Sequence, residues 1–398
     1  MSQYKTIDDL ENGTSRVLVR ADLNVPMKDG VITDTTRLDR TVPTLLELTD
    51  KGFGVIVLSH FGRPKGQRVD SMSLKPVAEG LSKSLGGKNV EFADDCIGTP
   101  AKKITSEMKP GDIVLLENLR FHSEEENNDR AFAAELASLG DAYVSDAFSC
   151  SHRAHASTEA LARLLPSAAG RLMQTELDAL TNALENPEHP VAALVGGAKI
   201  SSKMEVLGNL ASKVDFLIIG GAMANTFFHA QGVDVGKSLC EHDMAGAARD
   251  ILASAANTSC QVILPTDAVV AREFKEGAAS ENCSLDAIPV DSMILDIGPE
   301  SVVALEDVLE KCKTLVWNGP MGAFEISPFD AGTNAVAQAA ARLTKAGKLL
   351  SVAGGGDTVA ALANAGAAGD FSYISTAGGA FLEWLEGKTL PGVAVLRK

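Results

Sequence analysis

The sequence predicts an α/β protein built from two similar-sized, doubly wound parallel-sheet (Rossmann-like) domains that are joined by a helix and a hinge. Its 398 residues correspond to two domains of ordinary size. Short apolar runs of strand length recur in both halves, and each is followed by glycine or polar residues and then by a segment with helical spacing. Continuous apolar strands separated by helices are typical of parallel sheets that are covered on both faces.

The strands are expected where these apolar runs lie. In the first half the runs, each with the loop that follows it, occupy residues 16–26, 54–64, 113–122 and 142–148. In the second half they occupy residues 191–199, 215–224, 314–322, 348–358 and 373–380.

Helices are expected where apolar side chains recur every three or four positions. Residues 74–85, 173–184 and 204–214 show this spacing, so one face of each helix is apolar. The second of these helices ends at Asn186-Pro187, which favours a domain boundary there. We therefore expect an N-terminal domain over 1–170, an interdomain helix over 171–186, a C-terminal domain over 187–376 and a segment over 377–398 that returns to the first domain.

The composition restricts the classes of partner. With 36 Lys and Arg against 52 Asp and Glu, the formal net charge is 36 − 52 = −16, which disfavours nucleic acid. The start of the chain is polar and acidic, and the longest uncharged stretch, between Asp215 and Asp234, is too polar to span a membrane. The six cysteines form no Cys-x-x-Cys pair. We expect a cytoplasmic protein, a monomer, that binds no nucleic acid and no membrane.

Basic side chains follow the strands of the first half. Parallel strands end at one edge of a sheet, so these side chains should gather there. Arginine forks match carboxylates and phosphates, and such a group in an acidic chain predicts a small, multiply anionic acid as ligand. The alternatives are a surface ion pair for each arginine and a structural role for His155. The polar side chains at these strand ends are Arg20, Asp22, Asn24, His60, Arg63, Arg120, His122, His152, Arg153 and His155.

Glycine-rich loops follow the strands of the second half instead. Glycine lets backbone N–H groups approach an anion, and the next helix adds the positive end of its dipole, so several such loops predict a bound nucleotide. Lys199 and Lys203 are four residues apart, and we expect both on one face of the helix that follows the first loop. Asp357 is either a helix N-cap or a ligand of nucleotide-bound Mg²⁺. The loops contain Gly196-Gly197, Gly220-Gly221, Gly319, Gly354-Gly355-Gly356 and Gly378-Gly379.

Two other nucleotide motifs are incomplete. Gly236-Lys237-Ser238 resembles the end of a P-loop, but Gln231 replaces the first glycine. Gly354-x-Gly356 is a partial dinucleotide motif, but Val359 replaces its third glycine and no acidic residue stands about 20 positions further on. A Walker NTPase and a dehydrogenase are therefore disfavoured.

Nine ordered motifs resemble the phosphoglycerate kinase family over essentially the whole chain. Those of the first half are RADLNVP at 20–26, SHFGRP at 59–64, ENLRF at 117–121 and SHRAHAS at 151–157. Those of the second half are GGAKISSK at 196–203, GGAMANTF at 220–227, DIGPES at 296–301, WNGPMGAFE at 317–325 and GGGDT at 354–358.

The resemblance implies two binding sites and one metal. The first half would hold 3-phosphoglycerate through Asp22, Leu23, Asn24, Arg37, His60, Phe61, Gly62, Arg63, Arg120 and Arg153. The second half would hold Mg·ATP or Mg·ADP through Gly197, Lys199, Lys203, Gly221, Asn318, Pro320, Glu325, Gly354, Gly355, Gly356, Asp357 and Thr358, with Glu325 near the ribose and Asp357 on the metal. The implied catalytic set is Arg37, Lys199, Lys203, Gly355 and Gly378, and only the resemblance indicates Arg37.

The implied reaction is reversible phosphoryl transfer between 1,3-bisphosphoglycerate and ADP, which gives 3-phosphoglycerate and ATP by in-line attack after domain closure. The alternative is a non-catalytic, two-lobed protein that binds a phosphorylated acid. The chain departs from the usual family pattern at Ala21, Ser149, Ala323 and Ala377. A left-handed backbone at Ala377 would cost about 1–2 kcal/mol.

Overall fold

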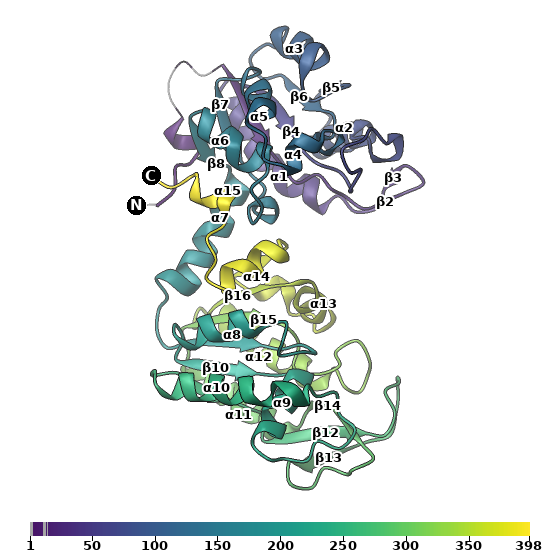
Figure 1. Ribbon diagram of the computed structural model, residues 1–398, viewed down its shortest axis with the longest axis vertical. Helices are drawn as coiled ribbons and strands as arrows, with labels where there is room; N and C mark the ends of the chain where they lie inside the picture. The colour runs from purple at the N-terminus through teal and green to yellow at the C-terminus, as the bar shows by residue number, and fades with distance from the viewer. Residues whose placement is uncertain (1–2, 11–12, 14) are drawn as a thin grey trace. The chain divides into compact units, whose positions relative to one another are not determined.

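The computed structural model describes residues 3–10, 13 and 15–398 and divides into two compact units (Figure 1). Unit 1 contains the chain up to Asp178 together with Thr389–Lys398, and unit 2 is Ala179–Lys388. Each unit is built around one six-stranded parallel sheet with helices on both faces. The predicted fold class is therefore confirmed.

The sheet of unit 1 has its strands in the order β5-β6-β4-β1-β7-β8, and every neighbouring pair is parallel. Its central strands are buried on both faces, as their apolar runs predict. The strands are β1 (Arg16–Arg20), β4 (Gly54–Leu58), β5 (Val90–Ala93), β6 (Ile113–Leu116), β7 (Ala142–Ser145) and β8 (Ser167–Ala169).

Successive residues of these strands point to opposite faces, and each face has its own core. Val17 and Val19 pack with α1 (Thr36–Asp50) and α2 (Lys75–Ser84), whereas Leu18 packs with α3 (Gly98–Ser106), α5 (Arg130–Ala137) and α6 (Leu161–Leu164). The remaining elements of the unit are η1 (Ile7–Asp9), β2 (Met27–Lys28), β3 (Val31–Ile32), η2 (Asp70–Met72), η3 (Leu119–Phe121), α4 (Ser123–Glu126), η4 (Phe148–Cys150), η5 (Ala156–Ala160) and α15 (Pro391–Ala394).

The two ends of the chain meet in unit 1 (Figure 1). Tyr4 and Arg397 form an antiparallel bridge, and the backbone N–H of Lys398 donates to the carbonyl of Gln3 at 3.0 Å. The last ten residues therefore complete the N-terminal unit rather than extend the second one.

The sheet of unit 2 has the order β11-β10-β9-β15-β16-β17, again with all neighbours parallel. Helices α8, α9 and α10 lie together on one side, and α11, α12 and α13 cover the other. The strands are β9 (Val191–Val195), β10 (Phe216–Ile219), β11 (Gln261–Ile263), β15 (Thr314–Asn318), β16 (Leu350–Gly354) and β17 (Tyr373–Ser375). The helices are α8 (Met204–Ala211), α9 (Ala222–Ala230), α10 (Ala245–Ala256), α11 (Pro299–Lys311), α12 (Ala331–Lys345), α13 (Gly356–Asn364) and α14 (Gly379–Leu385), with the short turns η7 (His242–Met244) and η8 (Ala368–Asp370).

Several strands of the structure were not predicted from the sequence. Unit 2 contains a small antiparallel sheet in the order β13-β12-β14, formed by β12 (Asp267–Ala271), β13 (Ser280–Ser284) and β14 (Met293–Ile297). The edge strands β5, β8 and β11 were also missed. Strands β5, β8, β11 and β13 are short or partly exposed, so they lack the continuous apolar run that marks a central strand.

The helix expected over residues 171–186 is present as α7 (Arg171–Leu180), continued by the π-helical turn η6 (Thr181–Glu185). Its first turn is held by Asp146, which follows β7 and is completely buried. The Asp146 Oδ1 atom accepts hydrogen bonds from the backbone N–H groups of Leu172 and Met173 at 3.0 and 3.2 Å. Among the described residues, no helix is long and apolar enough to cross a membrane.

Burial of Asp146 predicts a pH-dependent stability. Burial raises the pKa of Asp146 from 3.8 to about 7, so the folded protein keeps a proton that the unfolded chain loses. The stabilisation is complete below the unfolded pKa and is lost as the pH rises through the folded pKa, at up to about 1.4 kcal/mol per pH unit. In Asp146→Asn, which keeps the acceptor oxygen, this slope should disappear from thermal unfolding curves recorded between about pH 4 and 7. Parallel pH profiles of the two proteins would contradict this prediction.

Candidate active site

The parallel strands of unit 1 end at one edge of the sheet, which we call the mouth. The polar residues at the mouth follow four neighbouring strands. Asp22, His60, Arg120 and Arg153 follow β1, β4, β6 and β7, and these strands are adjacent in the sheet order. The structure therefore gathers at one edge the side chains that the sequence places far apart.

Asp22 is held by two groups at this edge. The Arg37 guanidinium at the start of α1 forms an ion pair with Asp22, and the Ser149 hydroxyl donates to Asp22 Oδ2 at 2.6 Å. Burial alone would raise the pKa of Asp22, but the neighbouring His60, Arg37, the Ser149 hydrogen bond and Arg20 together keep this pKa below its usual value. Ser149, which departs from the family pattern, thus helps to hold Asp22. Arg37 lies at the same mouth although it belongs to α1 and follows no strand of the sheet.

His60 is buried and neutral. Burial first, and then the charge of Arg20, lowers its pKa well below the usual value. The Arg20 Nη2 atom donates to His60 Nδ1 at 3.1 Å, so the imidazole proton is on Nε2. Arg20 itself is only 1% exposed and also donates to Ser157 Oγ at 2.9 Å. Arg20 is the last residue of β1, as expected, but its side chain is buried beneath the mouth, where it orients His60.

Backbone contacts hold the loops of the mouth together. The N–H of Leu23 donates to Ser59 Oγ at 2.9 Å, and the N–H of Gly62 donates to Asn24 Oδ1 at 3.0 Å. The N–H of Phe61 donates to Asn118 Oδ1 at 3.0 Å. Leu23, Asn24, Phe61 and Gly62 therefore form a bonded frame that fixes the loops after β1 and β4.

The arginines of the mouth differ in their partners. Arg120 is mostly buried, donates to the carbonyl of Gly62 at 2.9 Å and lies 3.3 Å from Glu126. Arg63 and Arg153 are exposed, and neither forms an ion pair with any residue that the structure describes. The alternative that each arginine serves a surface ion pair therefore does not account for these two.

Three other histidines of unit 1, His122, His152 and His155, were candidates as well. His122 pairs with Asp95 at 2.8 Å, and His152 accepts from Arg153 Nε at 3.1 Å. His155 is buried, and its Nδ1 atom lies 4.0 Å from Glu125 Oε1. Burial lowers the pKa of His155 to about 4. These surroundings favour the structural role for His155.

The glycine loops of unit 2 also gather at one edge, because β10, β9, β15, β16 and β17 are adjacent in the sheet. Four of them, the loops after β9, β15, β16 and β17, line a cavity of about 430 Å³. Its walls include Gly196, Gly197, Lys199, Lys203, Asn318, Gly319, Pro320, Gly355, Gly356, Asp357, Thr358, Gly378 and Gly379.

Gly355 is one of several glycines of this cavity that cannot be replaced without strain. Gly355 has φ +101°, and a Cβ atom there would lie 2.7 Å from Asn318 Nδ2. Asn318 Nδ2 donates to the carbonyl of Gly354 at 2.7 Å, which fixes the turn into α13. In the neighbouring loop Gly378 takes the positive φ of +46°, whereas Ala377 has none. The expected cost of a left-handed alanine therefore does not arise.

Lys203 projects into the same cavity. Its Nζ atom donates to Asn318 Oδ1 and lies 3.3 Å from the Asn318 carbonyl oxygen. Burial lowers the pKa of Lys203 from 10.5 to about 8, although Asp357 opposes this shift. Lys199 and Lys203 precede α8, which begins at Met204, so the prediction that both lie on its face is wrong. They line the cavity from a turn instead.

Asp357 lies in the first turn of α13, where it is exposed and where no hydrogen bond from its carboxylate to another described residue is found. The N-cap position belongs to Gly355. A free carboxylate beside a phosphate-sized cavity fits Mg²⁺, which binds proteins through one or two carboxylates and completes its shell with phosphates and water. The N-cap alternative is therefore not supported.

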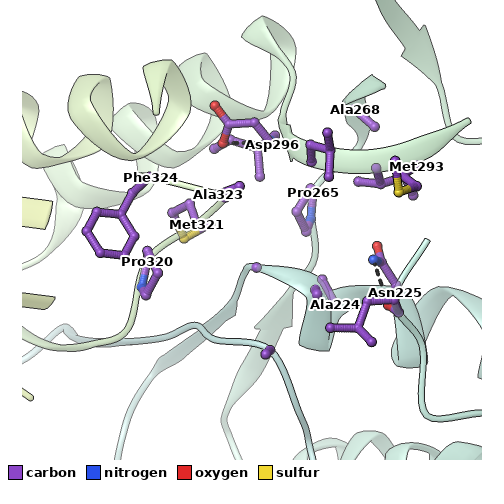
Figure 2. A pocket seen from close by; sticks show the side chains of 18 of the residues that line it. Ala224, Asn225, Pro265, Ala268, Met293, Asp296, Pro320, Met321, Ala323 and Phe324 are labelled. Atoms are coloured by element: carbon purple, nitrogen blue, oxygen red, sulfur yellow. Dashed lines mark hydrogen bonds between the residues drawn. The ribbon is translucent and has the colours of Figure 1, made fainter. Parts of the chain in front are cut away.

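A second cavity of about 330 Å³ adjoins the first and is shown in Figure 2. The two share Gly197, Ala198, Pro320 and Asp357, and the second also includes Gly221 and Glu325. Most of its wall was not named as a site from the sequence, although part of it lies within the motifs at 220–227, 296–301 and 317–325. The missed residues include Asn225, Phe228, Leu239, Pro265, Ala268, Phe274, Met293 and Phe324.

A parallel α/β fold with a basic mouth in one unit and phosphate-sized glycine loops in the other defines a phosphotransferase of two domains. The family model of phosphoglycerate kinase matches residues 7–388. Two curated relatives are the phosphoglycerate kinases of Methylorubrum extorquens (strain PA1), 60% identical over 100% of this chain and 99% of that protein, and of Ruegeria sp. (strain TM1040), 60% identical over 99% of each.

Solved structures give the same result. The phosphoglycerate kinase of Coxiella burnetii is similar with a TM-score of 0.92 and 41% identity over 99% of this chain and 98% of that one. That of Pyrococcus horikoshii OT3 has a TM-score of 0.79 and 31% identity over 98% of each chain. The chain belongs to the phosphoglycerate kinase family. It is a kinase of glycolysis that transfers a phosphoryl group reversibly between 1,3-bisphosphoglycerate and ADP, and the non-catalytic alternative is not favoured.

The lowered pKa of Lys203 predicts how ADP affinity depends on pH. Above about pH 8 the free protein loses the Lys203 proton, and phosphate binding must restore it, so the affinity for ADP should fall by up to about tenfold per pH unit. Arginine keeps its charge throughout this range, so Lys203→Arg should show a flat profile. Calorimetric titrations with Mg·ADP at several pH values measure both slopes. Equal slopes would contradict the assignment.

Proposed function

We propose that 3-phosphoglycerate binds at the basic mouth of unit 1 and that Mg·ATP or Mg·ADP binds at the glycine loops of unit 2. The observation that carries the proposal is the pair of exposed arginines without acidic partners, Arg63 and Arg153, at the strand ends of a chain whose net charge is −16. We further propose that the enzyme acts as a monomer in the cytoplasm.

The acid site needs donors for a phosphate and a carboxylate. Arg63, Arg120 and Arg153 supply guanidinium forks, and the Nε2–H of His60 adds a neutral donor. Asp22 keeps Arg37 at the same edge through their ion pair. The hydrogen-bonded frame of Leu23, Asn24, Phe61 and Gly62 keeps the loops after β1 and β4 in place.

The nucleotide site divides between the two adjoining cavities. Phosphates fit the 430 Å³ cavity, where backbone N–H groups, the start of α13 and Lys203 converge. The base fits the 330 Å³ cavity, whose wall is mostly apolar and includes Leu239 and Phe274, exposed by 53% and 55%. Glu325 lines this second cavity, within the expected region of the ribose.

Mg²⁺ would be held by Asp357 and by the nucleotide phosphates, where it supplies positive charge to the transferring group. The attacking group is the carboxylate of 3-phosphoglycerate, which is ionised at neutral pH, so no side chain has to act as a general base. The protein then has to align the substrates and neutralise charge, for which Arg37, Lys199, Lys203 and the backbone at Gly355 and Gly378 are suited.

The acid and the nucleotide are assigned to different units, so their reacting oxygens meet only when both substrates are enclosed. We propose a hinge at α7 and its flanks. Closure would also exclude water, which hydrolyses acyl phosphates.

The reaction is tested by the turnover of ATP with 3-phosphoglycerate and Mg²⁺, coupled to glyceraldehyde-3-phosphate dehydrogenase and the oxidation of NADH. Arg37→Ala should lower kcat by about 10² or more with little change in the KM for ATP, because the charge acts on the transferring group. Arg163→Ala, which removes an exposed arginine paired with Glu159, is the matched control and should leave kcat unchanged.

Two results would overturn the assignment. Loss of ATP affinity in Arg37→Ala equal to the loss of kcat would show that Arg37 belongs to nucleotide binding. An inactive but folded wild-type protein would contradict the reaction itself.

A further inference from the structure

Asp95, Cys96 and His122 form a group of three metal-binding side chains in unit 1. Asp95 and Cys96 lie in the turn between β5 and α3, and His122 follows η3 beyond the end of β6. β5 and β6 are neighbours in the sheet, so their carboxyl ends bring the two segments together (Figure 1). One carboxylate oxygen, the thiol sulfur and one imidazole nitrogen all lie within 4.8 Å of one another.

The spacing of these three atoms fits a tetrahedral Zn²⁺ site. Zinc lies about 2.3 Å from sulfur and about 2.0–2.1 Å from nitrogen or oxygen, so its ligands are about 3.3–3.6 Å apart. His122 Nε2 and Asp95 Oδ1 share a hydrogen bond of 2.8 Å and have to separate by about 0.5 Å to admit the ion. The His122 ring packs against Phe132 with centroids 5.2 Å apart, and the backbone N–H of Cys96 donates to Asp95 Oδ1 at 2.7 Å. Both side chains are therefore already oriented.

The Cys96 thiol is the least satisfied member of the group. Its side chain is 0% exposed, and its sulfur forms no hydrogen bond with any residue that the structure describes. The side chains of Asp95 and His122 are 38% and 26% exposed. Solvent therefore reaches two of the three ligands, and a water molecule can take the fourth position of a zinc ion.

The charges around Cys96 favour a cation. Burial raises the pKa of Cys96 well above its usual value, and the acidic side chains of Asp95, Glu125 and Glu117 raise it further. Negative groups that oppose a thiolate attract a divalent cation, and a bound cation in turn stabilises the thiolate.

A second group of three ligands, Asp22, His60 and Cys150, lies at the mouth. Here Arg20 Nη2 donates to His60 Nδ1 at 3.1 Å and lies 3.6 Å from Cys150 Sγ, and Arg37 pairs with Asp22. Each of these ligands already contacts a guanidinium group, whose charge repels a metal ion. Of the two groups found among the described residues, the one at the turn after β5 is therefore suited to a cation.

We propose that Asp95, Cys96 and His122 bind one Zn²⁺ ion, which ties the turn after β5 to the loop after η3. Zinc accepts thiolate and imidazole ligands, whereas Mg²⁺ prefers oxygen ligands alone. On binding, the S–H bond of Cys96 breaks, the sulfur gives its electron pair to zinc and the proton passes to solvent. The site uses no residue assigned to either substrate, so this inference is independent of the proposed function.

Cobalt tests the site, because Co²⁺ takes the ligands of Zn²⁺ and a cobalt–thiolate bond gives a charge-transfer absorption band. The full-length wild-type protein, with its cysteines reduced, is titrated with Co²⁺. We expect the band to reach full intensity at one equivalent, to disappear when Zn²⁺ is added and to persist in excess Mg²⁺. The affinity for Zn²⁺ is then measured by competition with a chromophoric chelator.

Two variants each remove one ligand with little change in volume. Cys96→Ser should abolish the cobalt–thiolate band. His122→Gln should weaken Zn²⁺ binding by about a hundredfold or more, because even the partners behind a metal ligand contribute about 10- to 100-fold in affinity. Cys150→Ser is the matched control. It removes the thiol of the second group, and both the band and the zinc affinity should survive.

Three results would overturn the proposal. The first is a wild-type protein that shows no cobalt–thiolate band. The second is a band that survives in Cys96→Ser or disappears in Cys150→Ser, because the sulfur ligand would then lie elsewhere. The third is His122→Gln with the zinc affinity of the wild type. If Cys96→Ser does not fold, the wild-type spectrum and His122→Gln, which changes a partly exposed side chain, still decide.

Discussion

Both sites depend on one constraint, the convergence of parallel strand ends at a single edge of a sheet. In unit 1 this convergence brings Asp22, His60, Arg120 and Arg153 together from segments that are far apart in the chain. In unit 2 it brings together five glycine-rich loops, four of which line a phosphate-sized cavity. The hydrophobic cores of the two units hold these edges in place, so the packing of the strands also determines where the proposed ligand sites lie.

A chain with a net charge of −16 has to bind anions against its own average field. The two units solve this problem differently. Unit 1 concentrates guanidinium groups and leaves Arg63 and Arg153 without acidic partners. Unit 2 relies on backbone N–H groups and on Lys203, whose burial lowers its pKa to about 8. If the nucleotide binds there as proposed, Lys203 gains charge when the phosphates bind, and nucleotide binding is coupled to proton uptake.

The sequence predicted the fold class, the central strands and the gathering of both sites, because these follow from apolar runs and from what stands at their ends. It could not predict features that depend on packing between distant segments. The sequence indicates Arg20 as a site residue, but its side chain is buried under His60. It marks Ser149 only as a departure from the family pattern, but the Ser149 hydroxyl donates a hydrogen bond to Asp22. Ala377 needs no left-handed backbone because Gly378 provides it.

The central claim is that each substrate has its own unit, and amide hydrogen exchange with one ligand at a time tests it most directly. 3-Phosphoglycerate alone should slow exchange in the loops after β1, β4, β6 and β7 and leave the glycine loops of unit 2 unchanged. Mg·ADP alone should slow exchange in the loops after β9, β10, β15, β16 and β17 and leave the mouth of unit 1 unchanged. Protection of the glycine loops by 3-phosphoglycerate alone, or of the mouth of unit 1 by Mg·ADP alone, would contradict the account.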